Sequence, residues 1–157
     1  MDFFFDSSGV VKNYVIETGT IWVKNIFNAV TTKIIYGVSI AQVEVVSAIA
    51  RRLKSGTLTI SDASTAATQF KYDFINDFRI VEIERLLLDR AVTLSEKYAL
   101  RGYDAVQLAA ALEVYANLIN LKIDFNRSTF TFVSADKELN SAAQNEGLTV
   151  ENPNNYP

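Results

Sequence analysis

The stretch Phe3-Phe4-Phe5-Asp6-Ser7-Ser8-Gly9 near the beginning of the sequence decides the fold. A short, uninterrupted apolar run is typical of a strand that is buried on both of its faces, as strands of a parallel sheet are. The run stops at Asp6, and Ser7-Ser8-Gly9 is expected to turn the chain. A carboxylate at the carboxyl end of such a strand faces the crevice in which open α/β sheets bind their ligands.

Strand-like and helix-like patterns alternate along the rest of the chain. We expect strands at residues 33–38, 78–83, 129–134 and 148–150, the last of them an edge strand stopped by Pro153. The spacing of apolar residues predicts helices at 18–31 and 39–56, from 61 onward, around 86–94, from 104 onward and before Gly147. This order predicts an α/β fold with three layers, α/β/α, and a mostly parallel central sheet, which residues 1–157 form as a single domain.

The segment after the second expected strand carries the signature of a helix start. Ser39, with Gln42 three residues later, matches a capping box. Glu44 falls beside the apolar face of this helix, so its carboxylate needs a partner, which is either a lysine or arginine or a metal ion. The residues expected on the buried face are Ile40, Val43, Val46, Ile49 and Leu53.

Three further acids, Asp6, Asp104 and Asp136, each lie where a strand or turn leads into a helix. Each has an ordinary explanation, because Asp6 suits a turn and the other two suit helix caps. Together with Glu44, however, they would meet at one edge of a parallel sheet, where their charges repel unless a cation holds them. Oxygen ligands suit Mg²⁺ or Mn²⁺, so the four acids predict a divalent metal site. Ser134 stands two residues before Asp136 and can hydrogen-bond a ligand or a neighbouring carboxylate.

The composition and motifs exclude several kinds of catalytic and metal-binding site. The chain has no histidine and no cysteine, which excludes a Ser-His-Asp triad, a Cys-His pair and a His/Cys zinc site. It has no glycine-rich Walker loop and no dinucleotide fingerprint, and its acids are too widely spaced for an EF-hand. No apolar stretch is long enough for a membrane span, so we expect a cytoplasmic protein with no membrane partner.

The charge balance argues against broad, nonspecific binding of nucleic acid, since the net charge is −3 and the pI is near 5.0. A local basic rim around an acidic site remains compatible with this balance. The cations that can supply such a rim are Arg51, Arg52, Lys54, Lys97, Arg101 and Lys137.

The order of these motifs resembles that of the PIN-domain nucleases, and most closely the VapC-type toxins of prokaryotic toxin–antitoxin pairs. The four segments that carry the resemblance span most of the chain and are Asp6-Ser7-Ser8-Gly9-Val10-Val11-Lys12-Asn13-Tyr14, residues 39–52, Leu100-Arg101-Gly102-Tyr103-Asp104-Ala105-Val106-Gln107-Leu108-Ala109 and Phe132-Val133-Ser134-Ala135-Asp136-Lys137-Glu138-Leu139. The chain departs from the family pattern at Gly102-Tyr103, where small aliphatic residues are usual, and at Gln107, where a histidine is frequent.

The resemblance implies a function and a set of site residues. Asp6, Glu44, Asp104 and Asp136 would be the catalytic, metal-binding acids, with Ser8 and Ser134 as polar support. The expected activity is a Mg²⁺- or Mn²⁺-dependent endoribonuclease acting on RNA. Family members are commonly homodimers that a small antitoxin protein neutralises.

Two alternative functions are also compatible with this sequence. The first is a binding module with little catalysis, for which Trp22, Phe27, Phe70 and Phe74 are the candidate surface. The second is a DNA-directed or structure-specific nuclease, whose metal site would have the same chemistry.

Overall fold

The computed structural model describes residues 1–29, 33–121 and 130–157. Its centre is a five-stranded sheet in the order β3-β2-β1-β4-β5, and every neighbouring pair of strands is parallel. The strands are β1 (Asp2–Phe5), β2 (Ile34–Val38), β3 (Phe78–Val81), β4 (Phe130–Val133) and β5 (Thr149–Glu151). Their positions confirm the strands expected from the sequence to within a few residues; Thr129, the expected first residue of the fourth strand, lies outside the described residues.

The three phenylalanines of β1 organise the layers, because successive side chains of a strand point to opposite faces. Phe3 and Phe5 belong to the apolar core on one face of the sheet, and Phe4 belongs to the core on the other. All three rings are buried, as expected for a strand covered on both sides. The sheet therefore has an apolar core on each face, which confirms the three-layer α/β/α arrangement.

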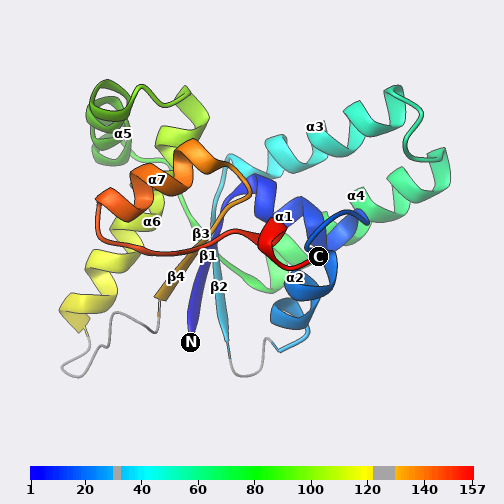
Figure 1. The fold of residues 1–157 in the computed structure, drawn as a ribbon, viewed down its shortest axis with the longest axis horizontal. Coiled ribbons are helices and arrows are strands. Elements are labelled where there is room, and N and C mark those ends of the chain that lie inside the picture. The colour runs from blue at the N-terminus through cyan, green and yellow to red at the C-terminus, as the bar shows by residue number, and fades with distance from the viewer. Residues whose placement is uncertain (30–32, 122–129) are drawn as a thin grey trace.

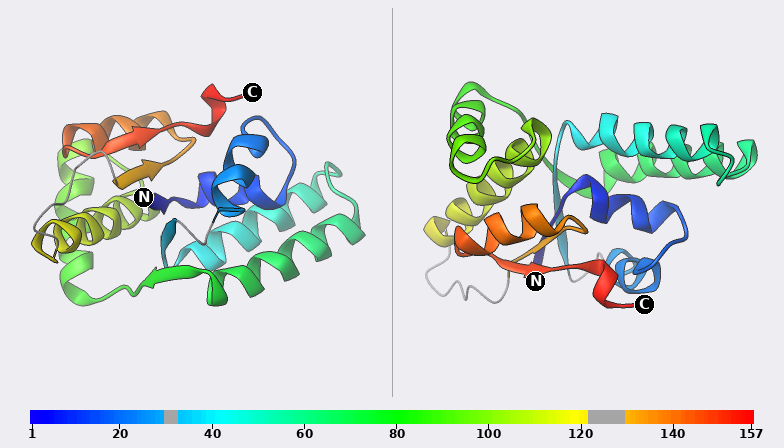
Figure 2. Two further views of the ribbon diagram at one scale, coloured as in Figure 1. Left: turned by 90° about the horizontal axis from the view of Figure 1, so that it is seen from below. Right: turned by 45° about the horizontal axis from the view of Figure 1, so that its top comes forward.

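Helices cover both faces (Figure 1). The core that contains Phe3 and Phe5 is closed by α1 (Ser7–Tyr14), α2 (Thr20–Phe27), α3 (Ala41–Lys54) and α4 (Ile60–Asn76). The core around Phe4 is closed by α5 (Arg85–Tyr98), α6 (Gly102–Leu121) and α7 (Lys137–Asn145). Helices α3 and α4 run side by side and extend beyond the edge of the sheet, as the views in Figure 2 also show. A short 3₁₀ turn, η2 (Pro153–Asn155), follows β5.

The strand order creates a switch point beside the central strand. From β1 the chain passes to β2 and β3 on one side, and then returns through α5 and α6 to β4 on the other side. The crevice between the carboxyl ends of β1 and β4 is the place where open α/β sheets bind ligands. The backbone N–H of Asp6 donates to the Val133 carbonyl oxygen across this point, at 3.1 Å.

Several local expectations were wrong. Ser7-Ser8-Gly9 does not turn the chain but forms the first turn of α1, because the Asp6 side chain caps that helix. The capping box is also absent: Ile40 is the N-cap of α3 and caps with no side chain. Ser39 is held by the sheet instead, since its N–H donates to the Val81 carbonyl oxygen at 2.9 Å. The helix expected from residue 104 onward begins two residues earlier, because Gly102 is the first residue of α6.

The buried face of α3 also differs from the expected one. Ala41, Val45 and Ile49 are buried, whereas Val43 is 64% exposed and Leu53 lies at the surface. The observed buried face therefore shares Ile49 with the expected one but is rotated away from Val43 and Leu53. This rotation leaves Glu44 half-buried at the sheet edge.

The aromatic residues proposed for a partner surface mostly belong to the core. Phe70 and Phe74 are fully buried between α4 and the sheet. Trp22 and Phe27 are half-buried, and the Trp22 ring stacks on Tyr156 with centroids 4.6 Å apart. Within the described ranges, no helix is long and apolar enough to cross a membrane.

Gly9 offers a test of how tightly α1 sits against the sheet. A methyl group at this position would lie 3.0 Å from the Val133 carbonyl oxygen and 3.1 Å from the Phe5 ring. Overpacking of this kind outweighs the gain in helix propensity, so Gly9→Ala is expected to lower the free energy of unfolding by about 1–2 kcal/mol. The control is Gly102→Ala, where a methyl group meets nothing within 4 Å. Urea denaturation of both variants measures the effect, and equal stabilities would contradict the packing described here.

Candidate metal-binding site

A cavity of about 370 Å³ lies beyond the carboxyl ends of β1 and β4. All four sequence-predicted acids line it, and they come from four different parts of the fold: the end of β1, the first turn of α3, the first turn of α6 and the N-cap of α7. Ser8 lines it as well, and Ser134 is buried directly behind it. The acids read from widely separated segments therefore converge on one cavity.

Asp6 is the most deeply placed of the four, with 4% of its surface exposed. Its Oδ1 accepts hydrogen bonds from the Ser8 hydroxyl at 2.7 Å and from the Gly9 N–H at 2.8 Å. Its Oδ2 accepts one from the Ser134 hydroxyl at 3.0 Å. Burial raises the pKa of the Asp6 carboxyl from its ordinary value of 3.8 to about 7, although these hydrogen bonds oppose the shift.

Two serine hydroxyls tie the end of β4 to Asp6. The Ser8 hydroxyl accepts the N–H of Ala135 at 2.9 Å, and the Ser134 hydroxyl accepts the N–H of Asp136 at 3.0 Å. Each hydroxyl also donates to Asp6, so each links the backbone after β4 to the carboxylate after β1. Both serines thus take the supporting position expected from the sequence.

Asp136 has both of the roles that the sequence left open, the helix cap and the cavity wall. Its Oδ1 accepts the N–H of Leu139 at 2.9 Å and caps α7, which is the ordinary explanation of an acid there. Its half-buried side chain also borders the cavity. Capping uses one carboxylate oxygen and fixes the direction of the other.

Glu44 is held by neutral donors. The Ser7 hydroxyl donates to Glu44 Oε2 at 2.6 Å, and the Gln107 side-chain amide donates to the same oxygen at 2.7 Å. The amide also donates to the Ser7 hydroxyl oxygen at 2.8 Å. Among the described residues Glu44 has no ion pair, so the lysine or arginine considered from the sequence is not its partner. These hydrogen bonds orient the Glu44 carboxylate and leave its negative charge in place.

Asp104 is half-buried, as Glu44 and Asp136 are. Helix α6 begins two residues earlier, at Gly102, so Asp104 lies in the first turn and not at the cap. Burial raises the pKa of its carboxyl, and the negative charges of Asp136 and Glu44 raise that pKa further. The charge of Arg101 opposes the shift. The acids are therefore close enough to repel one another.

The donor set suits a hard divalent cation, since it consists of carboxylate and hydroxyl oxygens without nitrogen or sulfur. Within the described part of the chain, however, no three acidic side chains stand close enough together to form a ready ligand cluster for one ion. The carboxylates border a common space without meeting at one point. The residues fit Mg²⁺ or Mn²⁺ by their chemistry, and binding would require their side chains to turn inward.

Three arginines, Arg51, Arg52 and Arg101, border the same cavity and supply part of the expected basic rim. The three lysines of that rim do not line the cavity, and Lys97 is paired with Glu146 at 2.7 Å.

Sequence reasoning missed the contribution of Ser7, assigned to a turn, and that of Gln107, noted only as a departure from a pattern. It also missed Glu17, a fifth acid on the cavity wall, which is paired with Lys12 and Arg52. The sequence held no local signal for these residues, because each acts through contacts to distant segments.

The fold occurs in several solved structures. PAE2754 from Pyrobaculum aerophilum superimposes with a TM-score of 0.62 at 17% identity, over 96% of this chain and 92% of that one. VapBC2 from Rickettsia felis, bound to a DNA fragment from its promoter, gives a TM-score of 0.61 at 12% identity over 97% of this chain and 98% of that one. FitAB bound to the IR36 DNA fragment gives a TM-score of 0.62 at 14% identity, over 96% and 94%. These likenesses show the fold, a PIN-like three-layer α/β/α arrangement around a parallel sheet.

Sequence similarity identifies the family within that class. No protein-family model matches the chain. Two curated proteins of Mycobacterium tuberculosis, Ribonuclease VapC45 of strain CDC 1551 / Oshkosh and Ribonuclease VapC49 of strain H37Rv, are each 32% identical to it over 111 residues. The match covers 71% of this chain and 75% of each relative. The chain belongs to the VapC family, which confirms the resemblance seen in its motifs.

The raised pKa of Asp6 predicts an unusual pH dependence of stability. Between about pH 4 and pH 7 the folded protein retains a proton on Asp6 that the unfolded chain has lost, so stability falls as the pH rises through this range. In the presence of EDTA, we expect the ionisation of Asp6 to lower the free energy of unfolding by about 2–4 kcal/mol as the pH rises through this range. Asp6→Asn removes this titration, so the stability of the variant relative to the wild type should increase with pH. Urea denaturation from pH 4.5 to 7.5 measures that difference, and a constant difference would contradict the shift.

Proposed function

We propose that this chain is a Mg²⁺- or Mn²⁺-dependent endoribonuclease and the toxin of a toxin–antitoxin pair, acting in the cytoplasm as one domain. The observation that carries the proposal is the convergence of Asp6, Glu44, Asp104 and Asp136 on one cavity at the switch point of the sheet. Its membership of a family whose curated members are named ribonucleases supports RNA as the substrate.

The four acids would hold the ion, and Ser8 and Ser134 would support them. A bound Mg²⁺ or Mn²⁺ supplies a Lewis acid that activates water and stabilises the charge of a phosphate in the transition state. The serines keep Asp6 and the backbone after β4 in fixed relation. Because the chain has no histidine, the proton released by the attacking water passes to a carboxylate or to solvent.

The arginines on the cavity wall would bind the substrate backbone. Arg51 and Arg101 are exposed and Arg52 is half-buried, so guanidinium groups stand beside the acids on the same cavity. Arginine pairs with phosphate through two parallel hydrogen bonds, which orients a strand as well as attracting it. In-line attack by water on the phosphodiester would leave a 5′-phosphate and a 3′-hydroxyl.

Protein partners follow from the same family. The solved structures with the same fold include VapBC2 and FitAB, each bound to a DNA fragment. An antitoxin that blocks the cavity and a homodimeric state of the toxin are part of the proposal. The binding-module alternative loses two of its four surface residues, because Phe70 and Phe74 are buried in the core.

Asp104→Asn tests the reaction. Asp104 borders the cavity without carrying a hydrogen bond that supports the fold among those described, so the variant should fold normally. We expect RNA cleavage in Mg²⁺ to fall by more than ~100-fold, since even groups that only support a metal ligand typically contribute 10–100-fold. The wild type with excess EDTA should be equally inactive. Cleavage that persists in either case would refute the mechanism, and faster cleavage of a matched DNA strand would identify a DNA-directed enzyme instead.

Gln107 tests the support of Glu44. Gln107→Leu keeps the volume of this buried side chain but removes the amide that donates to Glu44 Oε2. We expect Mn²⁺ affinity to weaken by about 10–100-fold, as for other groups that orient a ligand. Titration calorimetry measures this Mn²⁺ affinity. Gln107→Glu replaces the amide donor by a second negative charge, so its Mn²⁺ affinity should differ from that of the wild type and from that of Gln107→Leu. Wild-type affinity in Gln107→Leu would show that Ser7 alone orients Glu44.

A further inference from the structure

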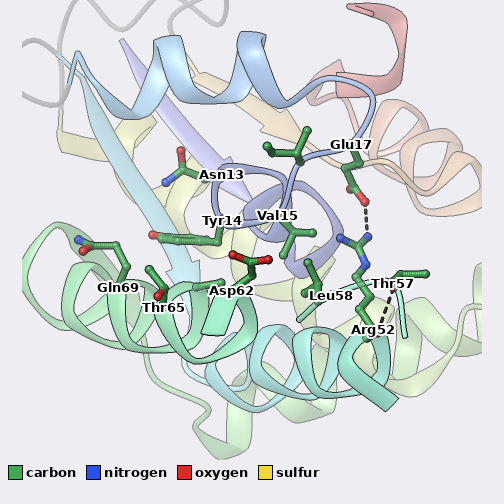
Figure 3. Close-up of a pocket in the computed structure, with 12 residues that line it drawn as sticks. Asn13, Tyr14, Val15, Glu17, Arg52, Thr57, Leu58, Asp62, Thr65 and Gln69 are labelled. Atoms are coloured by element: carbon green, nitrogen blue, oxygen red, sulfur yellow. Dashed lines mark hydrogen bonds and ion pairs between the residues drawn. The ribbon is translucent and has the colours of Figure 1, made fainter. Parts of the chain in front are cut away.

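A second cavity, of about 740 Å³, adjoins the acidic one (Figure 3). It lies between the connection from α1 to α2 and the hairpin formed by α3 and α4. Its volume is in the range of pockets that bind small organic groups. The two cavities share two wall residues, Glu17 and Arg52, and so border each other at this pair.

The shared pair is fixed in position. Arg52 forms an ion pair with Glu17 Oε2, and the buried ammonium of Lys12 binds Glu17 Oε1 at 2.8 Å. The Lys12 ammonium also donates to the Thr18 carbonyl oxygen at 2.9 Å and to Asn154 Oδ1 at 2.8 Å. A guanidinium has five N–H donors, so Arg52 keeps donors for a phosphate while Glu17 holds it at the boundary.

The walls of the second cavity differ from those of the first. Tyr14 contributes its ring, and its hydroxyl donates to Asp73 Oδ2 at 2.9 Å. The same carboxylate accepts the amide of Gln69 at 2.6 Å, so both side chains are held in place. Figure 3 shows the Tyr14 ring between Asn13 and the residues of α4. Burial raises the pKa of the Tyr14 hydroxyl, which therefore remains a donor to Asp73.

One acid in this cavity has an oxygen to offer a ligand. Asp62 lies at the start of α4, where its Oδ2 accepts the Thr59 hydroxyl at 2.7 Å. Among the described residues no donor is directed to its Oδ1. A carboxylate oxygen repels a phosphate but accepts a hydrogen bond from an amino group, as acidic side chains do from cytosine N4.

We propose that this second cavity is a nucleobase subsite, which takes the base next to the scissile phosphate and favours a base that carries an exocyclic amino group. The inference rests on the proposed function. The phosphate beside that base would lie on Arg52, at the boundary, with the scissile phosphate at the acidic cavity. The Tyr14 ring and the amide side chains of Asn13 and Gln69 suit a base, because bases stack on aromatic rings and are read by hydrogen bonds at their edges.

The arrangement of charge favours RNA over a peptide as the occupant. The arginines gather on the acidic cavity and at the shared boundary, so the phosphates have partners there. Beyond the boundary the wall contains no further cation among the described residues that line it. A nucleotide strand has this same order of parts, with anionic phosphates on one side and uncharged, hydrogen-bonding bases on the other.

The experiment blocks the cavity from an exposed position. Thr65 is exposed on α4 and lines the cavity, whereas its exposed neighbour Ser64 does not. Thr65→Phe fills the space, and Ser64→Phe is the matched control for adding a surface ring to the same helix. Cut sites are mapped on a random RNA library for both variants, for the wild type and for Asp62→Asn. Hydrolysis of bis(4-nitrophenyl) phosphate in Mn²⁺, a diester without bases, is measured in parallel.

We expect the wild type and Ser64→Phe to share a preference for an amino-bearing base at one position beside the cut. Thr65→Phe should lose that preference and about tenfold or more in kcat/KM for RNA, the scale of one stacked base, while hydrolysis of the small diester is unchanged. Asp62→Asn should lose the discrimination against uracil.

The possible outcomes distinguish a failure of the subsite proposal from a failure of the proposed nuclease function. An unchanged cut-site profile in Thr65→Phe, with normal hydrolysis of both substrates, would overturn the subsite and leave the nuclease intact. A variant that cleaves RNA normally but no longer binds a protein inhibitor would assign the cavity to a peptide and also overturn it. A wild type that hydrolyses neither substrate in Mn²⁺ would remove the proposed function and the subsite with it.

Discussion

The burial of one carboxylate at the end of the central strand is the constraint on which the rest of this site depends. Asp6 is removed from water by the sheet and by α1, and burial of an ionised carboxylate is costly. The surroundings compensate with three donors: the first turn of α1, the Ser8 hydroxyl and the Ser134 hydroxyl. These contacts also fix the start of α1 and the end of β4. The hydrogen bonds to Asp6 therefore shape both the local backbone and the site.

Two kinds of acid border the first cavity, and their partners distinguish them. Glu17 is paired with two cations, which neutralise it and fix it in the wall. Glu44 is held by a hydroxyl and an amide, which orient it and leave its negative charge. Burial raises the pKa of the Asp104 carboxyl, and the negative charges of Asp136 and Glu44 raise it further. Neutral donors thus preserve the repulsion that would favour a bound cation.

The sequence predicted the layers and the four acids because both depend on patterns that are local. A run of three phenylalanines specifies a buried strand wherever it lies, and an acid after such a strand lies at the sheet edge. The start of α3 was misread because Ser39 bonds the backbone of Val81, a distant residue, instead of capping its own helix. Gln107 and Ser7 meet Glu44 only in the folded chain. Such contacts between distant segments leave no periodic signal.

The buried ammonium group of Lys12 connects the end of the described chain to this site. Lys12 contacts Asn154, in the turn after β5, and Glu17, which holds Arg52. The nearby stacking of Tyr156 on Trp22 keeps that turn against α2. Proteolytic trimming of the last few residues would therefore deprive Lys12 of its amide partner and loosen Arg52, an arginine that lies far away in sequence and lines the acidic cavity.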